Sequence, residues 1–149
     1  MSRKFYIAYG SNLNVQQMKD RCPGAVQIGT TVLKDYRITF RSNWRSGVAN
    51  IEPRKGSNVP VGIWSITESD ECRLDRYEGY PTLYTKKVMM IKLPDLRTVP
   101  AIVYVMTPNK AWRKPSQDYL NTIRQGYKDF GFCDRRLMYA ASHPMNGTN

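Results

Sequence analysis

Short runs of β-branched and aromatic residues, separated by turn residues, recur along most of this 149-residue chain. Such runs are typical of strands. The predicted strands are residues 5–9, 26–32, 36–40, 48–51, 59–66, 83–93 and 99–106. They do not alternate one for one with helices, as a parallel βαβ fold requires. The sequence therefore predicts an α+β fold, with a small, barrel-like mixed or antiparallel sheet and flanking helices.

Three segments carry the cap residues and the apolar spacing of helices. The predicted helices are residues 14–21, capped by Asn12 or Asn14; residues 67–77, opened by a capping box of Thr67 and Asp70; and residues 117–130, between Ser116 and Gly131. The tail after Asp134 matches no motif and is expected to hold at most a short helix. A length near 150 residues is typical of one domain, so we expect residues 1–149 to fold as a single domain.

The chain is strongly basic, with 23 Lys and Arg against 12 Asp and Glu and a formal net charge of +11. The basic residues occur singly or in pairs, and no run of five or six forms a basic tail. This distribution favours a solvated basic surface over a dedicated nucleic-acid-binding face. Attraction of small anionic substrates is the remaining interpretation of the charge.

The absence of a recognisable targeting segment and the spacing of the cysteines predict a cytoplasmic protein without a membrane partner. No run of 18 apolar residues predicts a transmembrane helix, and the first residues lack the apolar stretch of a signal peptide. Cys22, Cys72 and Cys133 are widely spaced and form no CxxC motif. They therefore predict neither a disulfide framework nor a zinc site.

Several common catalytic patterns are missing from the sequence. It contains no GxSxG, GxGxxG or Walker motif. The single histidine, His143, lies in a tail beside a proline and is expected to be exposed. Because no cluster of metal-ligating residues is visible either, we expect neither a metal nor a cofactor.

Residues 9–13, Tyr-Gly-Ser-Asn-Leu, lie where the first predicted strand ends and a helix begins. Such a junction can direct several backbone N–H groups at one point, which suits a carboxylate or a phosphate. Gly10 would allow a ligand to approach the backbone or the backbone to adopt a positive φ. A plain turn with an asparagine cap explains the same residues.

Glu78 lies where the second predicted helix ends, between Tyr77 and Tyr80. The helix dipole disfavours a carboxylate at this end, and flanking aromatic rings would reduce its hydration. Both effects would raise its pKa toward the range that suits a general base. An ordinary surface glutamate is the alternative.

The order of these motifs resembles the γ-glutamylcyclotransferase-like (AIG2-like) family over about residues 4–132. The resemblance rests on YGSNL at 9–13, GVANI at 47–51, LDRYEGYP at 74–81 and KPS at 114–116. It implies a barrel-like sheet with a cavity at its mouth, and the release of 5-oxoproline from a γ-glutamyl compound. The pairing of YGSNL with the downstream LDxxEG is specific, whereas either motif alone would not be.

The resemblance also implies roles for individual residues. It implies that Glu78 is the catalytic acid and base. It also implies that residues 9–13 bind the amino-acid end of the γ-glutamyl group. The implied substrate-binding residues are Tyr9, Gly10, Ser11, Asn12, Leu13, Tyr84 and Tyr119. A non-catalytic binding module of the same fold and a basic nucleic-acid-binding protein are the alternatives. The leaving amine and the oligomeric state are not predicted.

Overall fold

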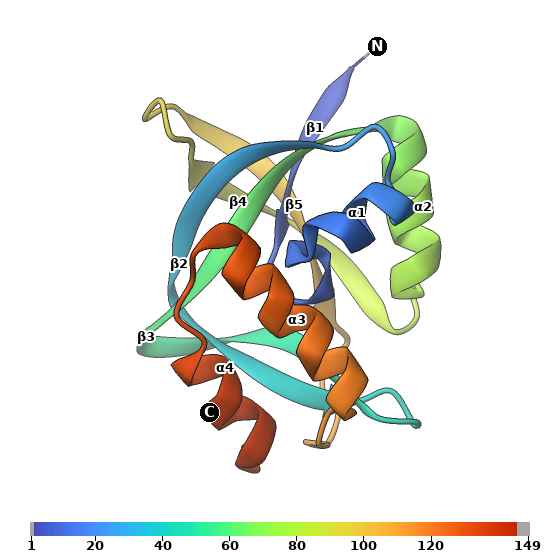
Figure 1. Ribbon diagram of the computed structural model, residues 1–149, viewed down its shortest axis with the longest axis vertical. Coiled ribbons are helices and arrows are strands. Elements are labelled where there is room, and N and C mark those ends of the chain that lie inside the picture. The colour runs from blue at the N-terminus through green and yellow to red at the C-terminus, as the bar shows by residue number, and fades with distance from the viewer. Residues whose placement is uncertain (1, 146–149) are drawn as a thin grey trace.

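The computed structural model describes residues 2–145, and five strands form one mixed sheet within them. The strands are β1 (Arg3–Ala8), β2 (Val26–Ser42), β3 (Gly47–Thr67), β4 (Tyr84–Lys92) and β5 (Thr98–Met106). Their order is β2-β3-β1-β5-β4 (Figure 1). β1 pairs with β5 in parallel, and the other neighbouring pairs are antiparallel. This arrangement confirms the predicted α+β class.

β2 and β3 are each much longer than the predicted strands. Residues 54–58, predicted to be a turn between two strands, lie inside β3, where Asn58 pairs with Lys34 and residues 54–57 have no register partner on β2. The hairpin bends at this point, where the register shifts between Lys34 and Tyr36. Asp35 and Gly56 both have positive φ there, and the Gly56 N–H donates to Asp35 Oδ1 at 2.9 Å. The turn-forming residues thus produce a bulge within a continuous hairpin.

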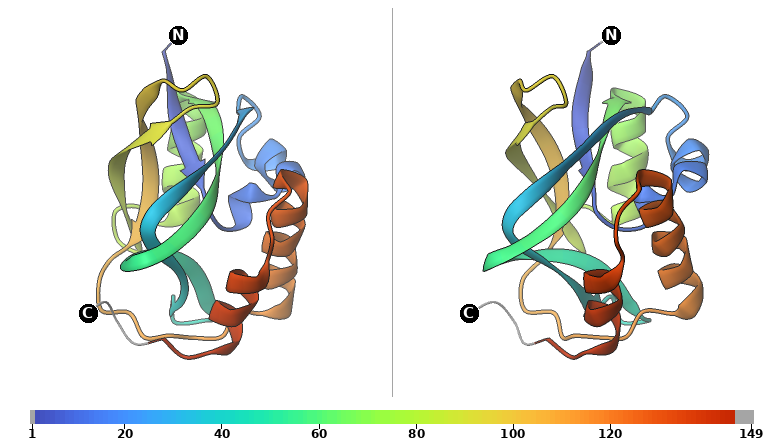
Figure 2. Two further views of the ribbon diagram at one scale, coloured as in Figure 1. Left: turned by 90° about the vertical axis from the view of Figure 1, so that its left-hand side faces the viewer. Right: turned by 60° about the vertical axis from the view of Figure 1, so that its left-hand side comes forward.

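Within residues 2–145, three of the four helices begin after the cap residues that the sequence indicates. The helices are α1 (Val15–Arg21), α2 (Glu68–Glu78), α3 (Gln117–Phe130) and α4 (Arg135–Ser142), with a 3-10 turn, η1 (Ser11–Leu13), before α1. Asn14 caps α1, the Thr67 and Asp70 capping box opens α2, and Ser116 caps α3. α1, α2 and α3 gather on one side of the curled sheet, whereas α4 packs on β2 (Figures 1 and 2).

Close packing of α3 on η1 fixes the strand-to-helix junction. A Cβ added at Gly126 of α3 would lie 2.6 Å from the backbone of Leu13 and Asn14, so only glycine allows this approach. Leu13 is fully buried, and its side chain forms part of the core. The first turn of α3, which carries Tyr119, is thereby held close to the loop at Gly10.

Candidate active site

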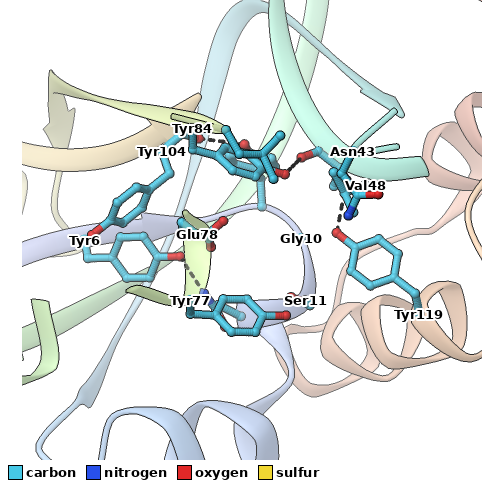
Figure 3. A pocket seen from close by; sticks show the side chains of 14 residues that line it. Tyr6, Gly10, Ser11, Asn43, Val48, Tyr77, Glu78, Tyr84, Tyr104 and Tyr119 are labelled. Atoms are coloured by element: carbon cyan, nitrogen blue, oxygen red, sulfur yellow. Dashed lines mark hydrogen bonds between the residues drawn. The ribbon is translucent and has the colours of Figure 1, made fainter. Parts of the chain in front are cut away.

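One cavity of about 190 Å³ opens where β1 ends, and it brings together segments far apart in the sequence (Figure 3). Its walls come from the junction after β1, the beginning of β3, the end of α2, and from β4, β5 and α3. The lining residues are Tyr6, Tyr9, Gly10, Ser11, Asn12, Asn43, Val48, Ala49, Tyr77, Glu78, Leu83, Tyr84, Tyr104 and Tyr119. Seven of the eight predicted site residues are among them, and Leu13, buried in the core, is not.

The loop at the end of β1 forms a single 3-10 turn, η1. The N–H groups of Leu13 and Asn14 donate to the carbonyls of Gly10 and Ser11, each at 3.0 Å. The preceding N–H groups, at Gly10, Ser11 and Asn12, begin the turn, where a helix offers no internal acceptor. A Cβ at Gly10 would lie 3.1 Å from the Cβ of Ala49, and Gly10 has a φ of −123°. Gly10 therefore serves close packing and not a positive φ.

Asn12 is buried and is held on three sides by hydrogen bonds. The Trp64 indole N–H donates to its carbonyl oxygen at 3.1 Å, and its amide Nδ2 donates to Tyr6 Oη at 3.0 Å. Arg21 Nη1 donates to Asn12 Oδ1 at 2.6 Å and to Ser11 Oγ at 3.2 Å. These bonds hold the loop in one conformation at the wall of the cavity.

Glu78 is the last residue of α2, and its carboxylate faces the cavity opposite Tyr119 (Figure 3). Burial raises the pKa of Glu78 to about 7, although the positive charge of Arg21 opposes this rise. The direction agrees with the sequence prediction, and burial is the cause. Tyr77 lines the cavity as expected, whereas Tyr80 lies outside it, with its ring beside Lys86.

Tyr84 and Tyr119 both hold the backbone of Ala49, but with opposite hydrogen-bond polarity. The Tyr84 hydroxyl donates to the Ala49 carbonyl at 2.6 Å, whereas the Tyr119 hydroxyl accepts from the Ala49 N–H at 3.0 Å. A phenol has a single proton. The proton of Tyr119 therefore remains available to a ligand, while Tyr84 can offer only an acceptor.

Several contributors to this site carry no signal in the sequence. The guanidinium of Arg21 lies 3.2 Å from the ring centre of Tyr77, which joins α1 to the end of α2. Tyr6 and Tyr104 line the cavity from β1 and β5, and Tyr9 Oη donates to the carbonyl of Tyr104 at 2.6 Å. These contacts depend on strand pairing and helix packing, so no residue spacing in the sequence predicts them.

Glu78 supplies the one carboxylate among the described residues that line the cavity. Within residues 2–145, no group of three or more His, Cys, Asp or Glu side chains is arranged to hold a metal ion. In the same part of the chain, no helix is both long enough and apolar enough to span a membrane.

Comparison with known proteins identifies the family. The model of the gamma-glutamyl cyclotransferase, AIG2-like family matches residues 6–121, more than half of the chain. The chain belongs to this family. The matched region of the AIG2-like chain contains every predicted site residue, from Tyr9 to Tyr119, so the resemblance seen in YGSNL and LDRYEGYP is confirmed as family membership.

Individual relatives carry the same family name. The gamma-glutamylcyclotransferases of Bos taurus and Homo sapiens are each 28% identical over 134 residues, which cover 85% of this chain and 71% of each relative. A solved structure of an uncharacterized human protein superposes with a TM-score of 0.82 at 26% identity, covering 100% of this chain and 93% of that one. A structure named gamma-glutamyl cyclotransferase gives a TM-score of 0.80 at 26% identity, with coverage of 99% and 92%.

Proposed function

We propose that this family member is a γ-glutamylcyclotransferase that converts the γ-glutamyl group of an amide substrate into 5-oxoproline and releases a free amine. The observation that carries the proposal is the placement of Glu78, whose pKa of about 7 suits a general base, in one cavity with the amides at residues 10–12. The family name of the curated relatives supports the same activity.

The size and polarity of the cavity suit a compact, charged amino-acid end. Its volume of about 190 Å³ lies below the roughly 300–1,000 Å³ of pockets that enclose drug-sized ligands. The α-carboxylate of the substrate would accept hydrogen bonds from the N–H groups at residues 10–12. Tyr84 would accept a hydrogen bond from the α-ammonium, and Tyr119 would donate one to a substrate oxygen.

The reaction needs one group that accepts a proton and later returns it. Glu78, as a carboxylate, takes a proton from the α-ammonium, and the freed amine attacks the γ-carbonyl carbon. The new C–N bond closes a five-membered ring and places a negative charge on the carbonyl oxygen. The carbonyl then re-forms, and the bond to the leaving nitrogen breaks as Glu78 gives its proton to that nitrogen. The ring nitrogen still carries one extra proton, which the regenerated Glu78 carboxylate removes and passes to the released amine. The atoms balance without a water molecule.

Most of the rate enhancement in this scheme comes from holding the substrate folded. Well-oriented intramolecular attack can lower a barrier by roughly 7–11 kcal/mol relative to a bimolecular step. The hydrogen-bonded loop at Asn12 and the anchored tyrosines at Ala49 provide rigid walls for this purpose. Catalysis then depends on a single ionisable side chain, Glu78.

The proposed activity also fits a reducing compartment such as the cytoplasm. Cys72 and Cys133 are exposed, and both are free thiols. Disulfides are rare in reducing compartments, where exposed thiols persist.

A panel assay tests this function directly. The purified protein is incubated with γ-glutamyl amino acids, γ-glutamyl peptides and γ-glutamyl amines, and 5-oxoproline and the released amine are quantified together. Equimolar release of both products from at least one substrate class supports the proposal and identifies the leaving amine. Saturable binding without product would assign the chain to a non-catalytic binding module. Neither binding nor turnover with any member of the panel would contradict the proposal.

A further inference from the structure

Four arginines that are scattered in the sequence line one surface hollow of about 400 Å³. Arg37 comes from β2, Arg54 from β3, and Arg135 and Arg136 from the first turn of α4. The basic residues form no long run along the chain, but the fold brings these four together. The clustering arises because α4 packs against β2 close to the bend of the β2–β3 hairpin (Figure 1).

Three of the four arginines form no ion pair with a carboxylate of the described residues. The exception is Arg37, whose Nη2 pairs with Glu52 at 3.5 Å. Among residues 2–145, no carboxylate forms an ion pair with Arg54, Arg135 or Arg136. Arg136 Nη1 donates to the carbonyl oxygen of Asn58 at 3.1 Å, which orients it without neutralising it.

The beginning of α4 adds to the positive potential. Asp134, the residue before α4, makes no capping hydrogen bond to the helix. Its carboxylate instead pairs with Arg124 at 3.0 Å. The first N–H groups of the helix, at Arg135 and Arg136, therefore lack a side-chain acceptor from the cap residue. The helix dipole favours an anion at this end, on the same side as the arginines.

We propose that this hollow is a second ligand site, which binds a phosphoryl group carrying at least two negative charges. Guanidinium groups present planar pairs of donors that match phosphate oxygens, and clustered arginines repel one another until an anion is bound. The hollow shares no lining residue with the cavity that contains Glu78. Arg135 and Arg136 also lie beyond residues 6–121, the part that matches the family model.

A compact phosphoryl group suits the hollow better than single-stranded nucleic acid. Nucleic-acid grooves usually add free aromatic faces on which successive bases stack. Tyr139 is the one aromatic side chain among the described residues that line this hollow. One face of its ring is already covered by His143, with ring centres 3.9 Å apart and planes within 9°.

Titration with inorganic pyrophosphate tests the site. We expect saturable binding by calorimetry and amide shift changes in NMR spectra that centre on residues 135–139. The double variant Arg135→Gln/Arg136→Gln should weaken binding at least tenfold. The control Lys92→Gln/Arg97→Gln removes the same charge from exposed positions around the β4–β5 turn and should change affinity less than twofold. Absence of saturation, or equal weakening in both double variants, would overturn the proposal.

Two further experiments distinguish loss of binding from loss of folding, and free phosphate from a phosphate ester as the ligand. The single variant Arg135→Gln keeps the bond from Arg136 to Asn58 and should still weaken pyrophosphate binding several-fold with an unchanged melting temperature. Titration with ADP asks whether a phosphate ester occupies the same site. Competition between ADP and pyrophosphate supports recognition of the phosphoryl group itself. A single-stranded oligonucleotide that binds more tightly than either, and equally in both double variants, would replace the proposal with a diffuse basic surface.

Discussion

Two glutamates on either side of one stretch of β3 show how burial can have opposite consequences. Glu78 faces the cavity at Ala49, and none of the described side chains donates a hydrogen bond to its carboxylate, so burial raises its pKa to about 7. Glu52, three residues beyond Ala49, is buried, whereas Glu78 is half-buried at the cavity wall. Burial alone would raise the pKa of Glu52, but hydrogen bonds from Arg41 and Thr39 outweigh it and lower the pKa.

The difference separates a reactive carboxylate from a structural one. Glu52 accepts from Arg41 Nε at 2.6 Å, from Arg41 Nη2 at 2.7 Å and from Thr39 Oγ1 at 2.8 Å, and these bonds favour its ionised form. Asn50 connects this cluster to β5, because its Oδ1 accepts from the Met106 N–H at 2.9 Å. Glu52 therefore stabilises the strand, whereas Glu78 retains the ability to gain and release a proton.

The largest expected effect is on turnover in Glu78→Gln. An amide of the same shape cannot accept a proton, and general-base catalysis typically contributes 10²–10⁴-fold. We expect 5-oxoproline release to fall by roughly that factor, with substrate binding retained. A variant that turned over as fast as the parent would remove Glu78 from the base role.

The next largest effect is on stability in Glu52→Gln. This change removes the carboxylate charge that faces the buried guanidinium of Arg41, and breaking a buried ion pair typically costs about 3–5 kcal/mol. Urea unfolding at pH 7 measures the loss. The control Asp95→Asn breaks the exposed pair with Arg97 and should cost far less, because solvent screens an exposed pair. Equal costs for the two variants would contradict the structural role of Glu52.

Glu78→Gln should have the opposite effect on stability from Glu52→Gln. A folded-state pKa of about 7, against an ordinary value of 4.5, means that Glu78 stabilises the fold below pH 4.5 and loses this contribution as pH rises through 7. The variant should therefore be more stable than the parent at pH 8, by up to about 3 kcal/mol, and the difference should shrink toward pH 4.5. Glu68→Gln, at an exposed position of the same helix, should show no such trend.

The smallest effect concerns the tyrosines that hold Ala49. Tyr84→Phe removes one hydrogen bond to the Ala49 carbonyl, which should cost about 1 kcal/mol of unfolding free energy. It should raise KM more than it lowers kcat, because the backbone position and the substrate contact change without loss of the base. Tyr139→Phe, at an exposed ring, is the matched control. A kcat loss as large as that of Glu78→Gln would contradict the assigned role.

The sequence predicts those parts of the structure that depend on neighbouring residues. The caps at Thr67 and Ser116 set the beginnings of α2 and α3 at the expected residues, because capping is local chemistry. β4 and β5 also match their predicted runs to within one residue at every end. By contrast, the bend at Gly56 was predicted as a turn, since a bulge is a property of two paired strands and not of one segment.

The candidate site divides in the same way. Glu78 and the loop at Gly10 could be singled out from a helix end and a strand-to-helix junction, and the family motif joined them. Arg21 holds the loop at Asn12 and opposes the rise in the pKa of Glu78. It could not be predicted from the sequence, because only the packing of α1 against α2 brings it to the site. The same argument applies to the arginines beside α4, which lie far apart along the chain.

The pH dependence of kcat/KM for 5-oxoproline release tests the central claim most directly. If Glu78 is the base, kcat/KM should rise with pH along a single ionisation and level off above about 7. Near pH 5 the value should then be about one hundredth of the plateau, because only that fraction of a group with this pKa is ionised. A profile that is flat between pH 5 and 8, or that levels off near pH 4.5, would contradict the account.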